Sequence, residues 1–170
     1  VIERGRQEVM RHVLGGENSV LITARSNKSS AMDHFFCSQQ LVETKCGEST
    51  VQSYSFPLYL YPDTSKQKLF NDLPENSERR PNFHPDLLPA LTDAYGFEPT
   101  PEDVFHYIYA VLYAPSYREK YAEFLKTDFP RVPFTADPEL FRALGRVGER
   151  LVKLHLLESD ELSPPDAQFH

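Results

Sequence analysis

The stretch from residue 100 to residue 134 restricts the fold more than any other part of the chain. Thr100, Pro101 and two acidic residues predict a helix start, because proline fits the first helical turn and carboxylates favour its positive end. Apolar residues then recur at helical spacing and predict one buried face: Val104, Phe105, Ile108, Val111 and Leu112. Pro115 disfavours helix at Ala114, so we expect a break there and a second helix that ends near Asp128. The stretch is dense in aromatic residues and carries no catalytic pattern, which indicates a core element.

The rest of the chain predicts a small sheet followed by further helices. We expect a helix over residues 2–14, then strands at 19–24, 33–38 and 54–61, joined by two polar loops at 25–30 and 43–52. A helix over 86–95 should end at Gly96, as helices often end at glycine. Asp137 and Pro138 open a last helix, whose apolar stripe is Leu140, Leu144, Val147, Leu151 and Leu154.

These elements predict an α+β fold, with a small, mostly antiparallel sheet in the N-terminal part and a helical C-terminal part. We expect one compact domain, divided into a helix and sheet part at 1–62, a linker-like segment at 63–84 and a helical part at 85–158. Residues 159–170 form an acidic tail, for which we expect disorder.

The same central stretch carries a family resemblance. Residues 105–121 read F-x-Y-I-Y-A-V-L-Y-A-P-x-Y-R-x-x-Y, and residues 125–134 read L-K-x-D-F-P-R-V-P-F. Shorter pieces agree with it at 16–18, 23–25 and 56–62. Over residues 5–158 the chain resembles the carboxy-terminal part of type ISP and related single-chain restriction-modification enzymes, which are bacterial proteins.

This resemblance implies a target-recognition domain that reads a specific sequence in double-stranded DNA. It would position that DNA for methyltransferase and nuclease domains that residues 1–170 do not contain. The expected partners are DNA and a covalently linked adenine methyltransferase domain. S-adenosylmethionine and Mg²⁺ are expected only in the parent enzyme, and the expected location is the cytoplasm. An alternative is an interaction module that docks onto its own methyltransferase domain or another partner without touching DNA.

The charge of the chain favours the alternative when it is taken whole, because the net charge is −7. Its distribution is uneven. Residues 61–110 hold four basic and nine acidic side chains, whereas residues 111–156 hold eight basic and six acidic ones. A local basic surface is therefore compatible with the composition.

Motifs for catalysis are largely missing from the sequence. The chain has no Asn-Pro dipeptide, and hence no Asn-Pro-Pro-Tyr motif for a flipped adenine, and it has no glycine-rich phosphate loop. Asp33 with Glu43-x-Lys45 matches parts of a metal-dependent nuclease, but so short a pattern arises by chance. His34, Cys37 and Cys46 could supply three zinc ligands without an evident fourth. We expect no catalytic residue, no metal and no cofactor in this chain.

The polar loops are the expected DNA-reading surface, since long polar side chains on loops can reach base edges. The candidates in them are Arg25, Asn27, Lys28, Thr44, Lys45 and Gln52. Second candidates for phosphate contact are Arg118, Lys120 and Arg131, of which Arg118 and Arg131 could equally form structural ion pairs. A basic ridge on the last helix could lie along phosphates or be a solvated face with local pairing: Arg142, Arg146, Arg150 and Lys153. No apolar run is long enough to cross a membrane.

Overall fold

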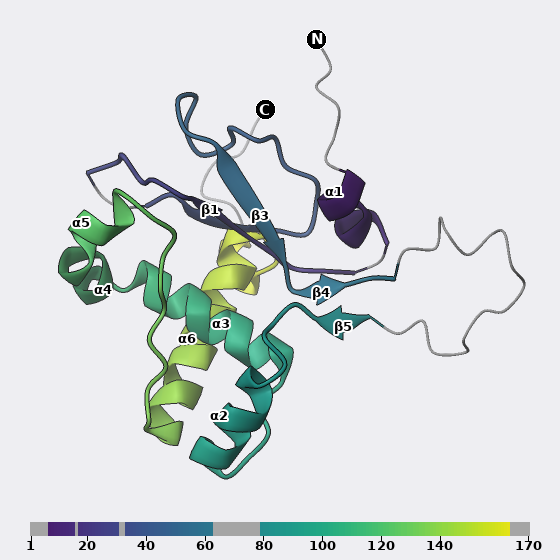
Figure 1. The fold of residues 1–170 in the computed structure, drawn as a ribbon, viewed down its shortest axis with the longest axis vertical. Helices are drawn as coiled ribbons and strands as arrows, with labels where there is room; N and C mark the ends of the chain where they lie inside the picture. Colours follow the sequence, from purple (N-terminus) through teal and green to yellow (C-terminus); the bar gives the residue numbers. More distant parts are fainter. Residues whose placement is uncertain (1–6, 16, 31–32, 63–78, 164–170) are drawn as a thin grey trace, which may run out of the picture.

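A three-stranded antiparallel sheet lies between two unequal layers of the chain (Figure 1). The computed structural model describes residues 7–15, 17–30, 33–62 and 79–163. Helix α1 (Gln7–Leu14) and the segment 39–52 lie on one side of the sheet. Helices α3 (Pro101–Tyr113) and α6 (Pro138–His155) cover the other side. This arrangement confirms the predicted α+β class, with the sheet first and the helices after it.

The central strand of the sheet is β1 (Val20–Ala24), and both of its neighbours run antiparallel to it. They are β2 (Phe35–Ser38) and β3 (Ser53–Pro57). Thr23 stands opposite both Phe35 and Tyr54, and Ala24 stands opposite Ser53. Because β2 and β3 run in the same direction, the chain between them crosses back along the sheet. The end of β1 and the beginning of β3 therefore meet at one end of the sheet.

The prediction of a single strand at 54–61 is wrong, because the structure has two strands there, separated at Leu58. Residues after the division form β4 (Tyr59–Leu60), which pairs with β5 (Arg80–Pro81) in a separate two-stranded sheet. The Leu58 N–H still donates to the carbonyl of Ser19 at 2.8 Å, next to the last β1–β3 pair, and the chain pairs with β5 only after it. Strand β5 lies within the segment that the sequence suggested as a linker, of which residues 63–78 are outside the described part.

Helix α3 is the centre of the helical half. Thr100 caps it as predicted: its hydroxyl accepts from the Asp103 N–H, and the Asp103 carboxylate accepts from the Thr100 N–H at 2.9 Å. The prediction of a single apolar face was too narrow, since Tyr107, Tyr109 and Ala110 are buried as well. The sheet, α6 and the segment 131–135 all pack around this helix.

Shorter helices surround α3. Helix α2 (Leu87–Tyr95) ends at Gly96, whose φ of 72° explains the glycine at that position. After the predicted break at Ala114, α4 (Pro115–Lys120) and α5 (Ala122–Leu125) follow as two short helices in place of the single one expected. The chain ends, in the described part, with a 3-10 turn at Asp160–Leu162.

Helix α6 buries a different face from the one predicted. Leu140 and Val147 are 46% and 59% exposed, whereas Phe141, Gly148 and Val152 are buried. The reason is close backbone packing: a Cβ atom at Gly148 would overlap the carbonyl oxygen of His106 on α3. Contact through glycine turns the helix so that its leucine stripe lies at the side of the interface.

Within the described ranges, no helix is long and apolar enough to span a membrane.

Candidate nucleic-acid interface

The first polar loop, residues 25–30, rests on α5 through hydrogen bonds to main-chain carbonyls. The Asn27 N–H donates to the carbonyl of Leu125 at 2.9 Å, and the Ser26 hydroxyl donates to the carbonyl of Lys126 at 2.7 Å. The acceptors are the last residue of α5 and the residue that follows it, where carbonyl groups lack helical partners. The loop therefore continues β1 directly onto the helical half of the molecule.

Two arginines from different segments approach one carboxylate beside this loop. The Arg25 Nε lies 3.4 Å from Asp128 Oδ1, and the Arg131 Nη2 lies 3.9 Å from Asp128 Oδ2. Their side chains are 64% and 80% exposed, so these pairs contribute little to stability. Arg131 also lies over the ring of Phe124, at 5.1 Å. Asp128 thus pairs with two exposed guanidinium groups and holds them near each other at the surface.

The second polar loop, residues 43–52, returns to the same end of the sheet. The carbonyl of Thr44 accepts from the Ser53 N–H at 2.6 Å, next to the start of β3. The Glu43 carboxylate accepts from the Lys45 N–H at 2.6 Å and closes a turn. Glu48 lies 3.7 Å from the Nε2 of His34, which stands just before β2. The two loops therefore lie at the same end of the sheet, where Ala24 stands opposite Ser53.

Five of the predicted reading residues are accessible in this region. Arg25, Lys28, Thr44 and Lys45 are exposed, and Gln52 is half-buried. We call these five residues the loop surface. Arg131 joins them through Asp128, while Lys120 is exposed on α4 with its ammonium group 5.4 Å from the Tyr121 ring centre.

Two other predicted residues are held by contacts within the molecule, Asn27 buried and Arg118 half-buried. Asn27 is 2% exposed, because the loop folds its side chain inward while its main chain binds α5. Arg118 donates from Nε to the carbonyl of Leu112 at 2.8 Å and stacks at 4.6 Å over the ring of Tyr113. It therefore caps the end of α3, a structural role that the sequence had left open. In this conformation the buried Asn27 side chain cannot reach DNA.

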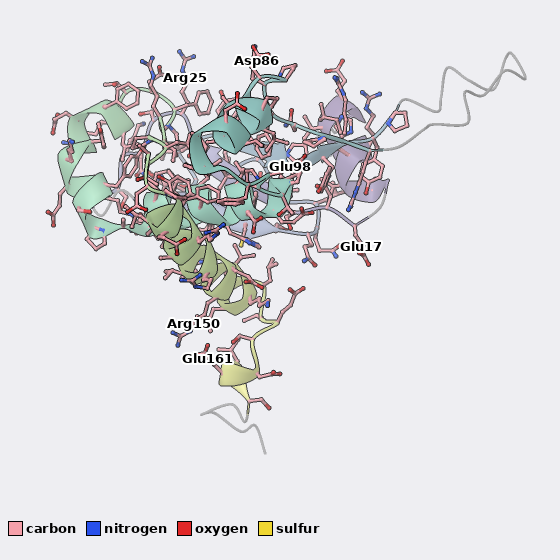
Figure 2. The ribbon with its side chains drawn as sticks, turned by 90° about the horizontal axis from the view of Figure 1, so that it is seen from below. Glu17, Arg25, Asp86, Glu98, Arg150 and Glu161 are labelled. Carbon is pink, nitrogen blue, oxygen red and sulfur yellow. The ribbon has the colours of Figure 1, made fainter. Side chains whose placement is uncertain are left out.

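The basic ridge predicted on α6 is mostly paired with acids. Arg142 and Lys153 bind Glu139 and Glu149 on their own helix, at 2.6 and 2.7 Å. Arg150 makes two hydrogen bonds to Glu161 beyond the end of the helix, and Figure 2 shows these two side chains facing each other. Local pairing thus explains most of the ridge.

Acidic residues dominate a different part of the molecule. Between residues 82 and 114 the chain has five acids and neither lysine nor arginine: Asp86, Asp93, Glu98, Glu102 and Asp103. In Figure 2, Asp86 and Glu98 lie on the α2 side, Glu17 lies near α1, and Arg25 lies at the edge beside α4 and α5. Repulsion of phosphate by these carboxylates leaves the loop surface as the more suitable side for an anionic polymer.

The nuclease and zinc patterns do not assemble. Among the residues that the structure describes, no three histidine, cysteine or acidic side chains are placed to hold a metal ion. A hydrogen bond from the Ser29 side chain lowers the pKa of Asp33, and the nearby charges of His34 and Arg118 act in the same direction. Glu43 is engaged in its own turn. Each of these acids is thus held in local structure.

Sequence reasoning missed Asp128 and an aromatic cluster beside it. Phe129 packs edge-on against Tyr54 and Phe56 of β3, with ring centres 5.0 and 5.7 Å apart. This cluster fixes the segment that carries Asp128 and Arg131 against the sheet. The spacing of three residues between Asp128 and Arg131 was visible in the sequence, but the approach of Arg25 depends on the fold.

Comparison with known proteins agrees with the resemblance. A family model described as the type ISP C-terminal specificity domain matches residues 1–169. A cryoEM structure of a DrdV–DNA complex is similar with a TM-score of 0.62 and 32% sequence identity, over 83% of this chain and 12% of that one. No curated protein matches the sequence. With almost its whole length matched by the family model, this chain belongs to the type ISP C-terminal specificity domain family.

Proposed function

We propose that this domain recognises a specific sequence in double-stranded DNA through the loop surface. The observation that carries the proposal is the meeting of two polar loops at one end of the sheet, where the main chain fixes them and their long side chains are exposed. The family's description as a specificity domain and the DNA in the similar complex support it.

The roles of the side chains follow from their chemistry. Lys28, Lys45, Lys120 and Arg131 suit phosphate contacts, which set the register of a protein on DNA. Arg25, Thr44 and Gln52 can donate to or accept from base edges, and arginine pairs well with guanine. As in the family, the domain would present its target to methyltransferase and nuclease domains of a larger cytoplasmic enzyme, which would use S-adenosylmethionine and Mg²⁺. Catalysis would then lie outside this chain.

The test is a titration of this chain with random-sequence duplex DNA, in which fluorescence anisotropy measures binding at low and near-physiological salt. We expect salt-sensitive binding, from which a preferred site can be selected. Lys28→Glu with Lys45→Glu should weaken binding at least tenfold at low salt. It should also reduce the salt slope by about 2, because two phosphate contacts are lost.

A matched control changes the same charge elsewhere. Arg146→Glu with Lys153→Glu, on α6, alters the net charge equally but lies away from the two polar loops. If both double variants weaken binding to the same extent, only total charge matters and the loop surface is not the interface. Unchanged binding by the loop variant, with its fold intact, would also exclude these loops.

A groove that borders the loop surface, with Thr44 and Gln52 in its lining, supports docking as a second candidate function. A cavity of about 210 Å³ lies between α1 and β3, lined mainly by apolar residues such as Val9, Met10 and Val13. Leu41 and Phe56, which also line it, are 42% and 41% exposed. We propose a methyltransferase domain of the larger enzyme as its occupant. Met10→Asp should then abolish association with that domain without changing DNA affinity.

A further inference from the structure

Three buried nitrogen atoms in the described part of the chain have no hydrogen-bond partner, and all three belong to one region. They are Asn27 Nδ2, His34 Nδ1 and Arg118 Nη2. Asn27 and His34 stand on the connection from β1 to β2, and the Arg118 guanidinium lies 5.7 Å from the ring of Phe35, where β2 begins. Buried polar atoms normally have hydrogen-bond partners. Three unpaired buried donors in one region therefore indicate that another conformation, in which they are paired, can be more favourable.

The orientation of the Asn27 side chain is fixed by its neighbour. The Ser29 N–H donates to Asn27 Oδ1 at 3.2 Å, which places the amino group on the opposite side. A flipped amide would set two donors against each other. Since Asn27 is only 2% exposed, its amino group is a buried donor that faces no acceptor.

Two hydrogen bonds join this loop to α5 and the residue that follows it. The main-chain bond of Asn27 to Leu125 and the hydroxyl bond of Ser26 to Lys126 are the two hydrogen bonds described above. The Arg25–Asp128 pair is exposed and adds little. If the loop leaves α5, these bonds break, and Asn27 and the carboxylate-bound Arg25 are freed together.

We infer that residues 25–30 leave α5 when DNA binds, and that Asn27 then reads a base edge. A carboxamide is the side chain best suited to bind N6 and N7 of adenine with two hydrogen bonds in the major groove. The bound state would satisfy the donor that the docked state leaves unpaired. This inference rests on the proposed function and identifies the docked loop as the state without DNA.

The direction in which Ser26→Ala changes DNA affinity tests the inference. The variant removes the 2.7 Å bond that stabilises the docked loop and takes nothing from the DNA-bound state. Affinity for the selected duplex should therefore rise about three- to fivefold, since binding no longer has to break that bond. The control is Thr92→Ala on α2, which removes a similar hydroxyl bond to Leu88 and should leave the affinity unchanged.

Asn27→Ala tests the reading role. It should lower affinity for the selected duplex at least tenfold and leave affinity for random duplex unchanged, so that the ratio of the two falls. Combined with Ser26→Ala, it should remove the preference while the loop remains loosened. Amide exchange of residue 27 without DNA should be faster in Ser26→Ala than in the wild type, which confirms undocking independently of any binding.

The outcomes separate the inference from the proposed function. If wild-type protein binds DNA but Ser26→Ala binds equally or more weakly, the loop acts in its docked position and the inference is wrong. If Asn27→Ala keeps the preference for the selected duplex, Asn27 is structural and water satisfies its amino group. If the wild-type chain binds no DNA at any salt concentration, the proposed function fails, and the inference fails with it.

Discussion

The side chain of Asn18 joins three segments of the N-terminal half. Its amino group donates to the carbonyls of His12 and Tyr59, at 2.9 and 2.8 Å, and its oxygen accepts from the Tyr59 N–H at 3.0 Å. Asn18→Ala should lower the free energy of unfolding by about 3 kcal/mol, because it leaves three buried main-chain groups unpaired. Urea unfolding measures this loss, and Asn82→Ala, which removes one bond to Pro57, should cost about 1 kcal/mol. Equal losses in the two variants would contradict this role.

Single residues also show where sequence reasoning stops. Asn18 was part of the family-like pattern, but its function depends on Tyr59, which is 41 residues away. Asn27 lies in a polar loop and was therefore expected at the surface, yet contact with α5 buries it. Polarity predicts whether a side chain needs a partner, but the fold decides whether that partner is water.

At the scale of elements, the packing of α6 on α3 depends on one glycine. Gly148→Ala should destabilise the protein by more than about 4 kcal/mol or prevent folding, since the new methyl group would overlap the His106 carbonyl. Gly145→Ala is the matched control: its Cβ would lie 3.9 Å from the Asp103 carbonyl, an ordinary contact. That variant should be more stable by about 0.5 to 1 kcal/mol, because alanine favours helix. Thermal and urea unfolding of the two variants check the pair. Similar stability of both would show that the helices separate easily.

The elements that could be predicted were those with local signals. Thr100 with Asp103 begins α3, Asp137 begins α6, and Gly96 ends α2, each through contacts within a few residues. The pairing of β4 with β5 had no such signal, because it joins residues about twenty positions apart and includes Pro81. The buried face of α6 also could not be predicted from the spacing of apolar residues, since a glycine contributes to that face and carries no hydropathy signal.

At the scale of the whole molecule, three histidines make stability depend on pH: His12 is buried, His106 is half-buried and His155 is more exposed. Burial lowers the pKa of His12, His106 and His155 below 6.5. The unfolded chain then binds more protons than the folded one as pH falls through 6.5, so the free energy of unfolding decreases. Two of these rings also make hydrogen bonds with uncharged groups. His12 Nδ1 accepts from the Tyr61 N–H at 2.9 Å, and His155 Nδ1 lies 2.6 Å from the Tyr109 hydroxyl.

The expected result is a lower urea midpoint at pH 5.5 than at pH 7.5. His12→Gln should reduce this difference, whereas His84→Gln should not, because the His84 side chain is 77% exposed. Carboxylates add to the loss only in more acidic solution, where Asp33 and Glu149 take up protons. A midpoint that rises on acidification would contradict the histidine account.

The main-chain anchoring of both polar loops has a consequence for how such a domain diversifies. In the protein without DNA, the Thr44 carbonyl and the Asn27 N–H position the loops through main-chain bonds, which do not need particular side chains at positions 44 and 27. Positions 25, 28, 45 and 52 can then be exchanged without disturbing the hydrophobic core. Preference for one target can drift or be re-engineered faster than the architecture that supports it, and a library confined to these positions should consist largely of folded proteins.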